Sequence, residues 1–182
     1  MSALIRIFLV RSLLAWGAIS LIGVLAIIGF VAFKHVTYAD QPNGAATFKD
    51  VRFVLNWCAL GDKRFISVMH SHVTARSLGG DHLDAYAIKI SHVSPSELPS
   101  TKRGGWHRGD QLPMVIDDAV GFAETARNSS DIPWFPPAAD IRNQTYYVYL
   151  WSIKYYGTDP SAVDLILVRP ADNMVYYIGL ST

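Results

Sequence analysis

Residues 12–33 are the longest apolar stretch of the chain, 22 residues without a charged side chain. As an α-helix rising about 1.5 Å per residue, they would extend roughly 33 Å, enough to cross a hydrocarbon layer about 30 Å thick. We therefore expect a single transmembrane helix that serves as an uncleaved signal-anchor. The alternative is a cleaved secretory signal ending at 37–39, although the apolar regions of such signals span only about 7–15 residues.

The basic residues around this stretch predict its orientation. Arg6 and Arg11 precede it, and Lys34 follows it. Positive charge favours the cytoplasmic side, so residues 1–11 are expected to be a short cytoplasmic N-terminus. The predicted location is the cytoplasmic (inner) membrane, with the C-terminal domain periplasmic or otherwise extracytoplasmic.

Residues 34–46 read as a linker, and residues 47–182 have the patterns of one small α+β domain. Five segments show the alternation, or the β-branched and aromatic content, that is typical of strands: 64–74, 84–93, 145–156, 163–169 and 174–180. Between the last two, a loop at 170–173 contains Asn173, which tolerates a left-handed backbone. Residues 94–105, with two prolines and two glycines, are typical of a connecting loop.

Residues 110–127 carry apolar side chains three and four positions apart, which predicts an amphipathic helix. Asp110 is the expected N-cap of this helix. Strands in runs with one strong helix predict an antiparallel sheet packed on that main helix.

Residues 47–60 are ambiguous. Thr47 and Asp50 have the spacing of a helix capping box, and Gly61 suits a helix C-terminus. The alternation of Val51 with the aromatic and aliphatic residues that follow it favours a strand, and we expect the strand.

Charge argues against a nucleic-acid ligand. All fifteen Asp and Glu residues follow residue 39, and thirteen of the sixteen Lys and Arg residues follow His35, so the domain carries a net charge of −2. Affinity for nucleic acid depends largely on neutralising phosphates with Lys and Arg. The single cysteine, Cys58, cannot form an intramolecular disulfide and is expected to be a small buried apolar residue.

The linear motifs of the common enzyme classes do not occur in the chain, including H-E-x-x-H, C-x-x-C, G-x-S-x-G and the phosphate-binding loops. His70 and His72 would share one face of a strand, and two imidazoles on one face are the strongest indication of a metal. We expect Lys89 to lie opposite His70, where an ammonium would repel a cation. The sequence therefore predicts neither a metal site nor a cofactor.

The loops on either side of the predicted helix contain the residue types that anchor protein interfaces. Tryptophan and arginine are enriched at binding hot spots, and prolines in the second loop reduce the entropy lost on binding. These loops supply the predicted binding residues, which are Trp106, His107, Arg108, Trp134 and Phe135. If the two loops converge, they form one patch; a role of the rings as lids over the core is the alternative.

The expected function is binding to a partner protein by a membrane-anchored, non-catalytic domain. An inhibitor or immunity factor and an accessory subunit of a membrane complex both fit this expectation. The alternative is a metal-dependent or hydrolytic enzyme that uses His70 and His72. The sequence does not identify a small-molecule ligand.

Overall fold

The computed structural model describes residues 3–37, 46–77, 79–98, 105–130 and 132–182. The chain divides into two compact units, Met1–Ala39 and Asp40–Thr182. Residues 38–45 of the predicted linker and 99–104 of the predicted loop lie outside the described residues.

The first unit contains one continuous helix, α1 (Ala3–Thr37). Within the described part of the chain, no helix combines the length and the apolar character that a membrane crossing requires. The predicted span at 12–33 includes positions 12, 14, 15, 32 and 33, whose side chains lie outside the described residues. The span therefore stays a prediction.

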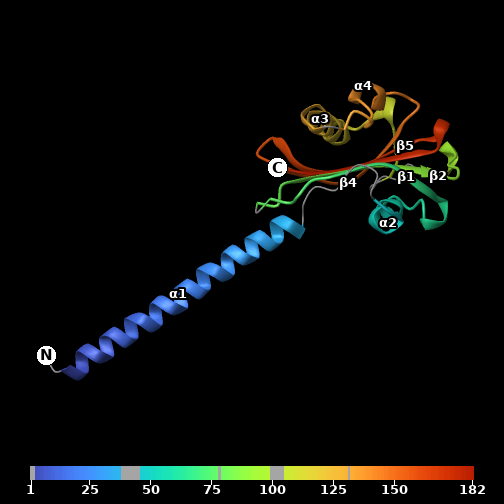
Figure 1. Ribbon diagram of the computed structural model, residues 1–182. Helices are drawn as coiled ribbons and strands as arrows, with labels where there is room; N and C mark the ends of the chain where they lie inside the picture. Colours follow the sequence, from blue (N-terminus) through green and yellow to red (C-terminus); the bar gives the residue numbers. More distant parts are fainter. Residues whose placement is uncertain (1–2, 38–45, 78, 99–104, 131) are drawn as a thin grey trace. The chain divides into compact units, whose positions relative to one another are not determined.

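The second unit is an α+β domain built on a six-stranded antiparallel sheet, as the sequence predicts (Figure 1). The strand order is β1-β2-β6-β5-β4-β3, so the hairpin β1–β2 is joined to the meander β4–β5–β6 through the pairing of β2 with β6. The strands are β1 (Phe65–Val73), β2 (His82–Ile90), β3 (His107–Arg108), β4 (Tyr147–Tyr156), β5 (Asp159–Arg169) and β6 (Met174–Ser181).

Helices cover both faces of this sheet, whereas the sequence predicted one main helix. The helices α3 (Met114–Ser129) and α4 (Ala138–Ile141) lie on one face, and α2 (Phe48–Trp57) lies on the other (Figure 1). Each face has its own apolar core, because the side chains of a strand point alternately to the two sides. We call the two sides the α3 face and the α2 face.

The strand expected at 47–60 is wrong, because this segment forms α2. The backbone N–H and the hydroxyl of Thr47 both donate to Asp50 Oδ2 at 2.7 Å, and this capping box starts the helix. Val51, Val54 and Leu55 follow at helical spacing and are buried against the sheet. The alternation that favoured a strand arises because the apolar face of α2 is wide enough to include Phe53 and Trp57 at its margin.

The predicted helix at 110–127 forms, but it begins later and without the expected cap. α3 starts at Met114, directly after Pro113, and Asp110 lies in a preceding 3-10 turn. Arg108 competes for this carboxylate: its guanidinium donates to both oxygens of Asp110, at 2.5 and 3.0 Å. Asp110 is therefore paired with Arg108 and does not cap α3.

Candidate functional site

One row of the sheet places two carboxylates on the α2 face. Asp84 of β2 pairs with Gly179 of β6, and Gly179 pairs with Asp164 of β5. Directly paired residues of antiparallel strands point to the same side of a sheet. Asp164 pairs in turn with Ser152 of β4, so polar residues continue across four strands. We call Asp84, Gly179, Asp164 and Ser152 the acidic row.

α2 does not pack on the acidic row. Its buried side chains contact the apolar and aromatic rows next to it, which include Tyr86, Ile166 and Tyr177. α2 has 10 residues, roughly 15 Å of helix, whereas the 11 residues of β5 extend roughly 36 Å. Figure 1 shows α2 against only one part of this side of the sheet. The acidic row thus lies on a part of the α2 face that α2 does not cover.

The absence of a side chain at Gly179 makes room for Tyr177. The Tyr177 hydroxyl occupies the space that a Cβ at position 179 would need, and it donates to Asp164 Oδ1 at 2.7 Å. Ser152 Oγ donates to Asp164 Oδ2, also at 2.7 Å. Burial and the bond to Asp164 raise the pKa of Tyr177 well above its usual value of 10, so Tyr177 keeps its proton.

Asp84 is less well satisfied than Asp164. Its side chain is only 16% exposed, and Arg76 approaches Oδ2 at 3.5 Å. Oδ1 is buried and has no hydrogen-bond partner among the described residues. Burial raises the pKa of Asp84, while His82 and Arg76 oppose this rise. A buried carboxylate oxygen without a partner is costly, and a donor from outside the domain would relieve that cost.

Aromatic rings border the acidic row on the side of α2. Trp57 of α2 and Trp151 of β4 are stacked, with ring centroids 4.8 Å apart and planes inclined by 4°. Phe53 packs edge-on against Trp57 and against Tyr177. Trp151 remains 46% exposed, and the next residue along β4 is Ser152, which binds Asp164. An accessible indole and a carboxylate therefore lie beside each other.

This arrangement is suited to binding a cation rather than to acid–base catalysis. Carboxylates and the faces of tryptophan and tyrosine rings both attract Lys and Arg side chains. Tyr177 and Ser152 each donate a hydrogen bond to Asp164, one to each carboxylate oxygen, and so hold the carboxylate in place. The acidic row together with Trp57 and Trp151 is our candidate site.

The predicted binding residues do not form one patch. Trp106 is only 4% exposed and belongs to the core of the α2 face, with its ring 5.4 Å from that of Tyr149. Phe135 is 1% exposed and belongs to the core of the opposite face. His107 and Arg108 form β3 at one edge of the sheet, paired with β4. The two loops do not converge, because the sheet lies between the rings of Trp106 and Phe135.

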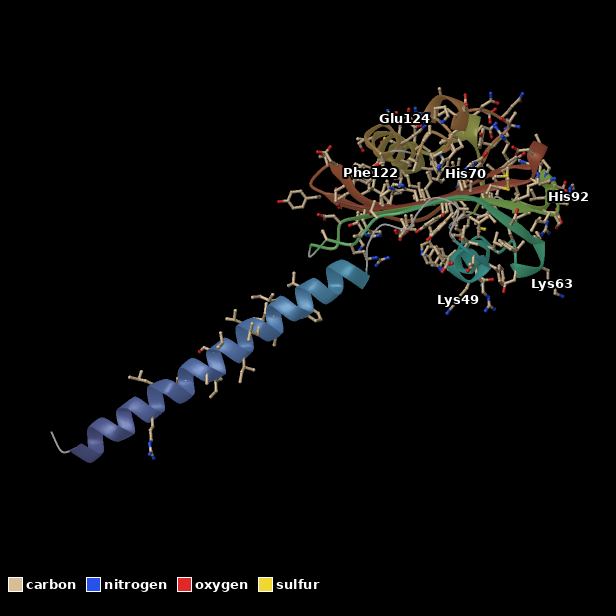
Figure 2. The ribbon with its side chains drawn as sticks, in the orientation of Figure 1. Lys49, Lys63, His70, His92, Phe122 and Glu124 are labelled. Atoms are coloured by element: carbon tan, nitrogen blue, oxygen red, sulfur yellow. The ribbon has the colours of Figure 1, made fainter. Side chains whose placement is uncertain are left out.

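Trp134 and His70 contact each other at the other edge of the sheet. Their rings are stacked with centroids 5.3 Å apart, and Trp134 packs partly against the core of the α3 face. Figure 2 shows His70 on the side of the sheet that carries α3. Trp134 Nε1 is buried and has no hydrogen-bond partner among the described residues.

The pairing of the two histidines differs from the prediction. His70 lies opposite Ala87 and His72 opposite Ala85, whereas Lys89 pairs with Ser67. The turn between β1 and β2 shifts the pairing of His70 and His72 by two residues, and the irregularity between Val68 and His70 displaces Lys89 by one more. In the described chain, no three His, Cys, Asp or Glu side chains are grouped so that they could hold a metal ion.

The sequence contained signals for the acidic row that we did not use. Asp84, Asp164 and Gly179 each stand two positions from an apolar or aromatic residue of the same strand, which places them on a face that is otherwise core. A glycine inside a strand is typical of close approach by another group. The pairing of β2 with β6 joins segments about 90 residues apart, and no local pattern predicts it.

No protein-family model, no curated protein and no solved structure matches this chain.

Proposed function

We propose that this chain is a membrane-anchored, non-catalytic binding protein whose α+β domain captures a basic segment of a partner protein outside the cytoplasm. The observation that carries the proposal is the exposed Trp151 next to Ser152, which binds the carboxylate of Asp164, on a row that also contains Asp84 two strands further along. An inhibitor or immunity factor and an accessory subunit of a membrane complex are both consistent with such a surface.

The sequence and α1 support the membrane anchor. Residues 12–33 contain no charge, and they belong to one uninterrupted helix. The large apolar side chains described in this helix are exposed, among them Leu13, Trp16 and Phe30. Large exposed apolar surfaces are typical of contacts with a membrane or with another protein.

The charge and the shape of the site favour a basic partner segment. Asp84 has a buried oxygen that no described residue hydrogen-bonds, and a lysine or arginine side chain would supply a donor to it. The stacked indoles of Trp57 and Trp151 provide a rigid apolar platform for the aliphatic part of such a side chain. Tryptophans that lose little entropy on binding are typical hot-spot residues.

Photo-crosslinking in native membranes tests the proposal. A photoreactive phenylalanine analogue at position 151 of the full chain should crosslink to one partner, and the attached peptide should contain lysine or arginine. The affinity of that purified partner is then measured on chains that keep Trp151. Asp84→Asn and Asp164→Asn should each weaken binding by about tenfold or more, because breaking a charged pair at an interface costs several kcal/mol. Met114→Ala, an exposed apolar truncation on the opposite face, is the matched control.

Two results would contradict this function. One is a crosslinked peptide without basic residues; the other is a partner whose affinity is unchanged in both aspartate variants. The anchor has its own test, a topology reporter fused after Thr182. Activity of a reporter that works only outside the cytoplasm is the expected result, and activity restricted to the cytoplasm would reverse the predicted orientation.

A further inference from the structure

A second hollow lies on the other side of the sheet, between the last turn of α3, the turn that joins β1 to β2, and the end of β6. Its volume is about 380 Å³, within the range of about 300–1,000 Å³ that is typical of small-molecule sites. It is separate from the acidic row, which lies on the α2 face of the sheet. None of the predicted binding residues lines it.

The inner wall of this hollow is apolar. Leu83 and Leu180 are buried residues of the α3-face core that reach the hollow from β2 and β6, and Ala126 reaches it from α3. Phe122, one turn before Ala126, adds an aromatic ring. Figure 2 shows Phe122 on the side of the sheet that carries α3. A ligand therefore needs an apolar body that fits against a phenyl ring and two leucines.

The rim of the hollow is rich in hydrogen-bond acceptors. Thr125 Oγ1 donates to Gly121 O at 3.3 Å, and Ser129 Oγ donates to Ala126 O at 3.1 Å. Each hydroxyl uses its single proton in the bond just described, so it can only accept a hydrogen bond from a ligand. The Nδ1 of His82 lies 2.8 Å from the carbonyl oxygen of Gly80, which only accepts, so Nδ1 is the donor in this contact.

Asp81 gives the hollow a negative charge. It is the only Asp, Glu, Lys or Arg among the described residues that line the hollow. Ser129 and Ser130 stand at the C-terminus of α3, where the helix dipole and the last free carbonyls favour positive charge. A carboxylate, a helix C-terminus and a rim of acceptors all select a donor with positive charge.

We infer that this hollow binds a small ligand with an apolar body and a primary or secondary ammonium group. The body packs against Phe122, Leu83 and Leu180. The ammonium group faces Asp81 and the end of α3. Asp81 disfavours an anion of the same size by charge repulsion.

Leucine-methyl NMR of the full chain in detergent micelles tests this inference with three probes of one shape: 2-phenylethylammonium, 2-phenylethanol and phenylacetate. The ammonium probe should shift the methyl signals of Leu83 and Leu180 in a saturable way and leave Leu55, in the core of the opposite face, unchanged. Phenylacetate should bind at least about tenfold more weakly, because charge-assisted hydrogen bonds are the strong ones.

Two variants and a control locate the site. Ser129→Trp, at an exposed position on the rim, should block the hollow and abolish the shifts. Asp81→Asn should weaken binding of the ammonium probe several-fold, whereas Asp140→Asn, which removes an exposed carboxylate on α4, should not. The inference is overturned if the ammonium probe gives no saturable shift, if phenylacetate binds equally well, or if Ser129→Trp leaves binding intact.

Discussion

The hydroxyl of Tyr177 lies directly over Gly179, two residues later on the same strand, in the space that a side chain at 179 would occupy. This contact lets Tyr177 donate to Asp164 on the neighbouring strand at 2.7 Å. One missing side chain thus permits a buried tyrosine to hydrogen-bond a half-buried carboxylate, and it fixes the geometry of the acidic row.

We predict that Gly179→Ala destabilises the domain by about 1–3 kcal/mol, because the new methyl group must displace Tyr177 from Asp164. Thermal or urea unfolding of the full chain gives the free-energy change. The control is Gly121→Ala: no atom lies within 4 Å of a Cβ there, and α3 should gain up to about 1 kcal/mol. Equal changes in the free energy of unfolding for the two substitutions would contradict the close contact between Gly179 and Tyr177.

Trp106 and Trp151 should respond oppositely to truncation. Trp106→Ala removes a core ring that is 4% exposed, and it should cost about 3–5 kcal/mol of stability. Trp151→Ala removes a half-exposed ring and its stacking on Trp57, which is worth about 0.5–1.5 kcal/mol beyond the buried area. Unfolding curves distinguish them. A small loss of stability in Trp106→Ala would instead indicate that Trp106 is a surface residue.

Neutralising Asp84 should stabilise the protein at neutral pH. Burial raises its pKa above the ordinary value of 3.8, so the folded state binds this proton up to a higher pH than the unfolded chain does. The charged carboxylate therefore costs stability above the folded pKa, and the cost disappears below pH 3.8. Melting temperatures of Asp84→Asn and wild type from pH 3 to 7 should differ most at pH 7.

Asp140→Asn is the control for the pH series, because this carboxylate is exposed on α4. A melting temperature of Asp84→Asn below that of wild type at pH 7 would contradict the prediction. It would mean that the pairing with Arg76 outweighs the cost of burial, although Arg76 is itself largely exposed and 3.5 Å away.

Cys58 should be unreactive in the folded protein. It is buried in the core of the α2 face, and burial raises the pKa of the thiol from 9 to about 12. The reactive thiolate is then roughly 10³-fold scarcer than in an exposed cysteine near pH 8. Alkylation followed by mass spectrometry should label Cys58 only after denaturant is added; rapid labelling of the native chain would show that α2 detaches from the sheet.

Local patterns in the sequence were sufficient for most of the secondary structure. Alternation and β-branched residues predicted the five long strands, and the three/four spacing of apolar residues predicted α3, because these periods reflect which side chains face a core. Asn173 adopts the left-handed backbone expected in the last hairpin, with φ of 53°. Where two periods competed, at 47–60, the capping box of Thr47 and Asp50 decided for a helix.

Only the tertiary structure decided where the functional groups meet. The pairing of β2 with β6 brings Asp84 to Gly179, and the β5–β6 hairpin adds Asp164; the first of these contacts spans about 90 residues and leaves no local trace. The aromatic residues Trp106 and Phe135 resemble surface anchors in the sequence, but the sheet separates them and buries both rings. Burial depends on which elements pack on each face, and residue type alone does not specify that.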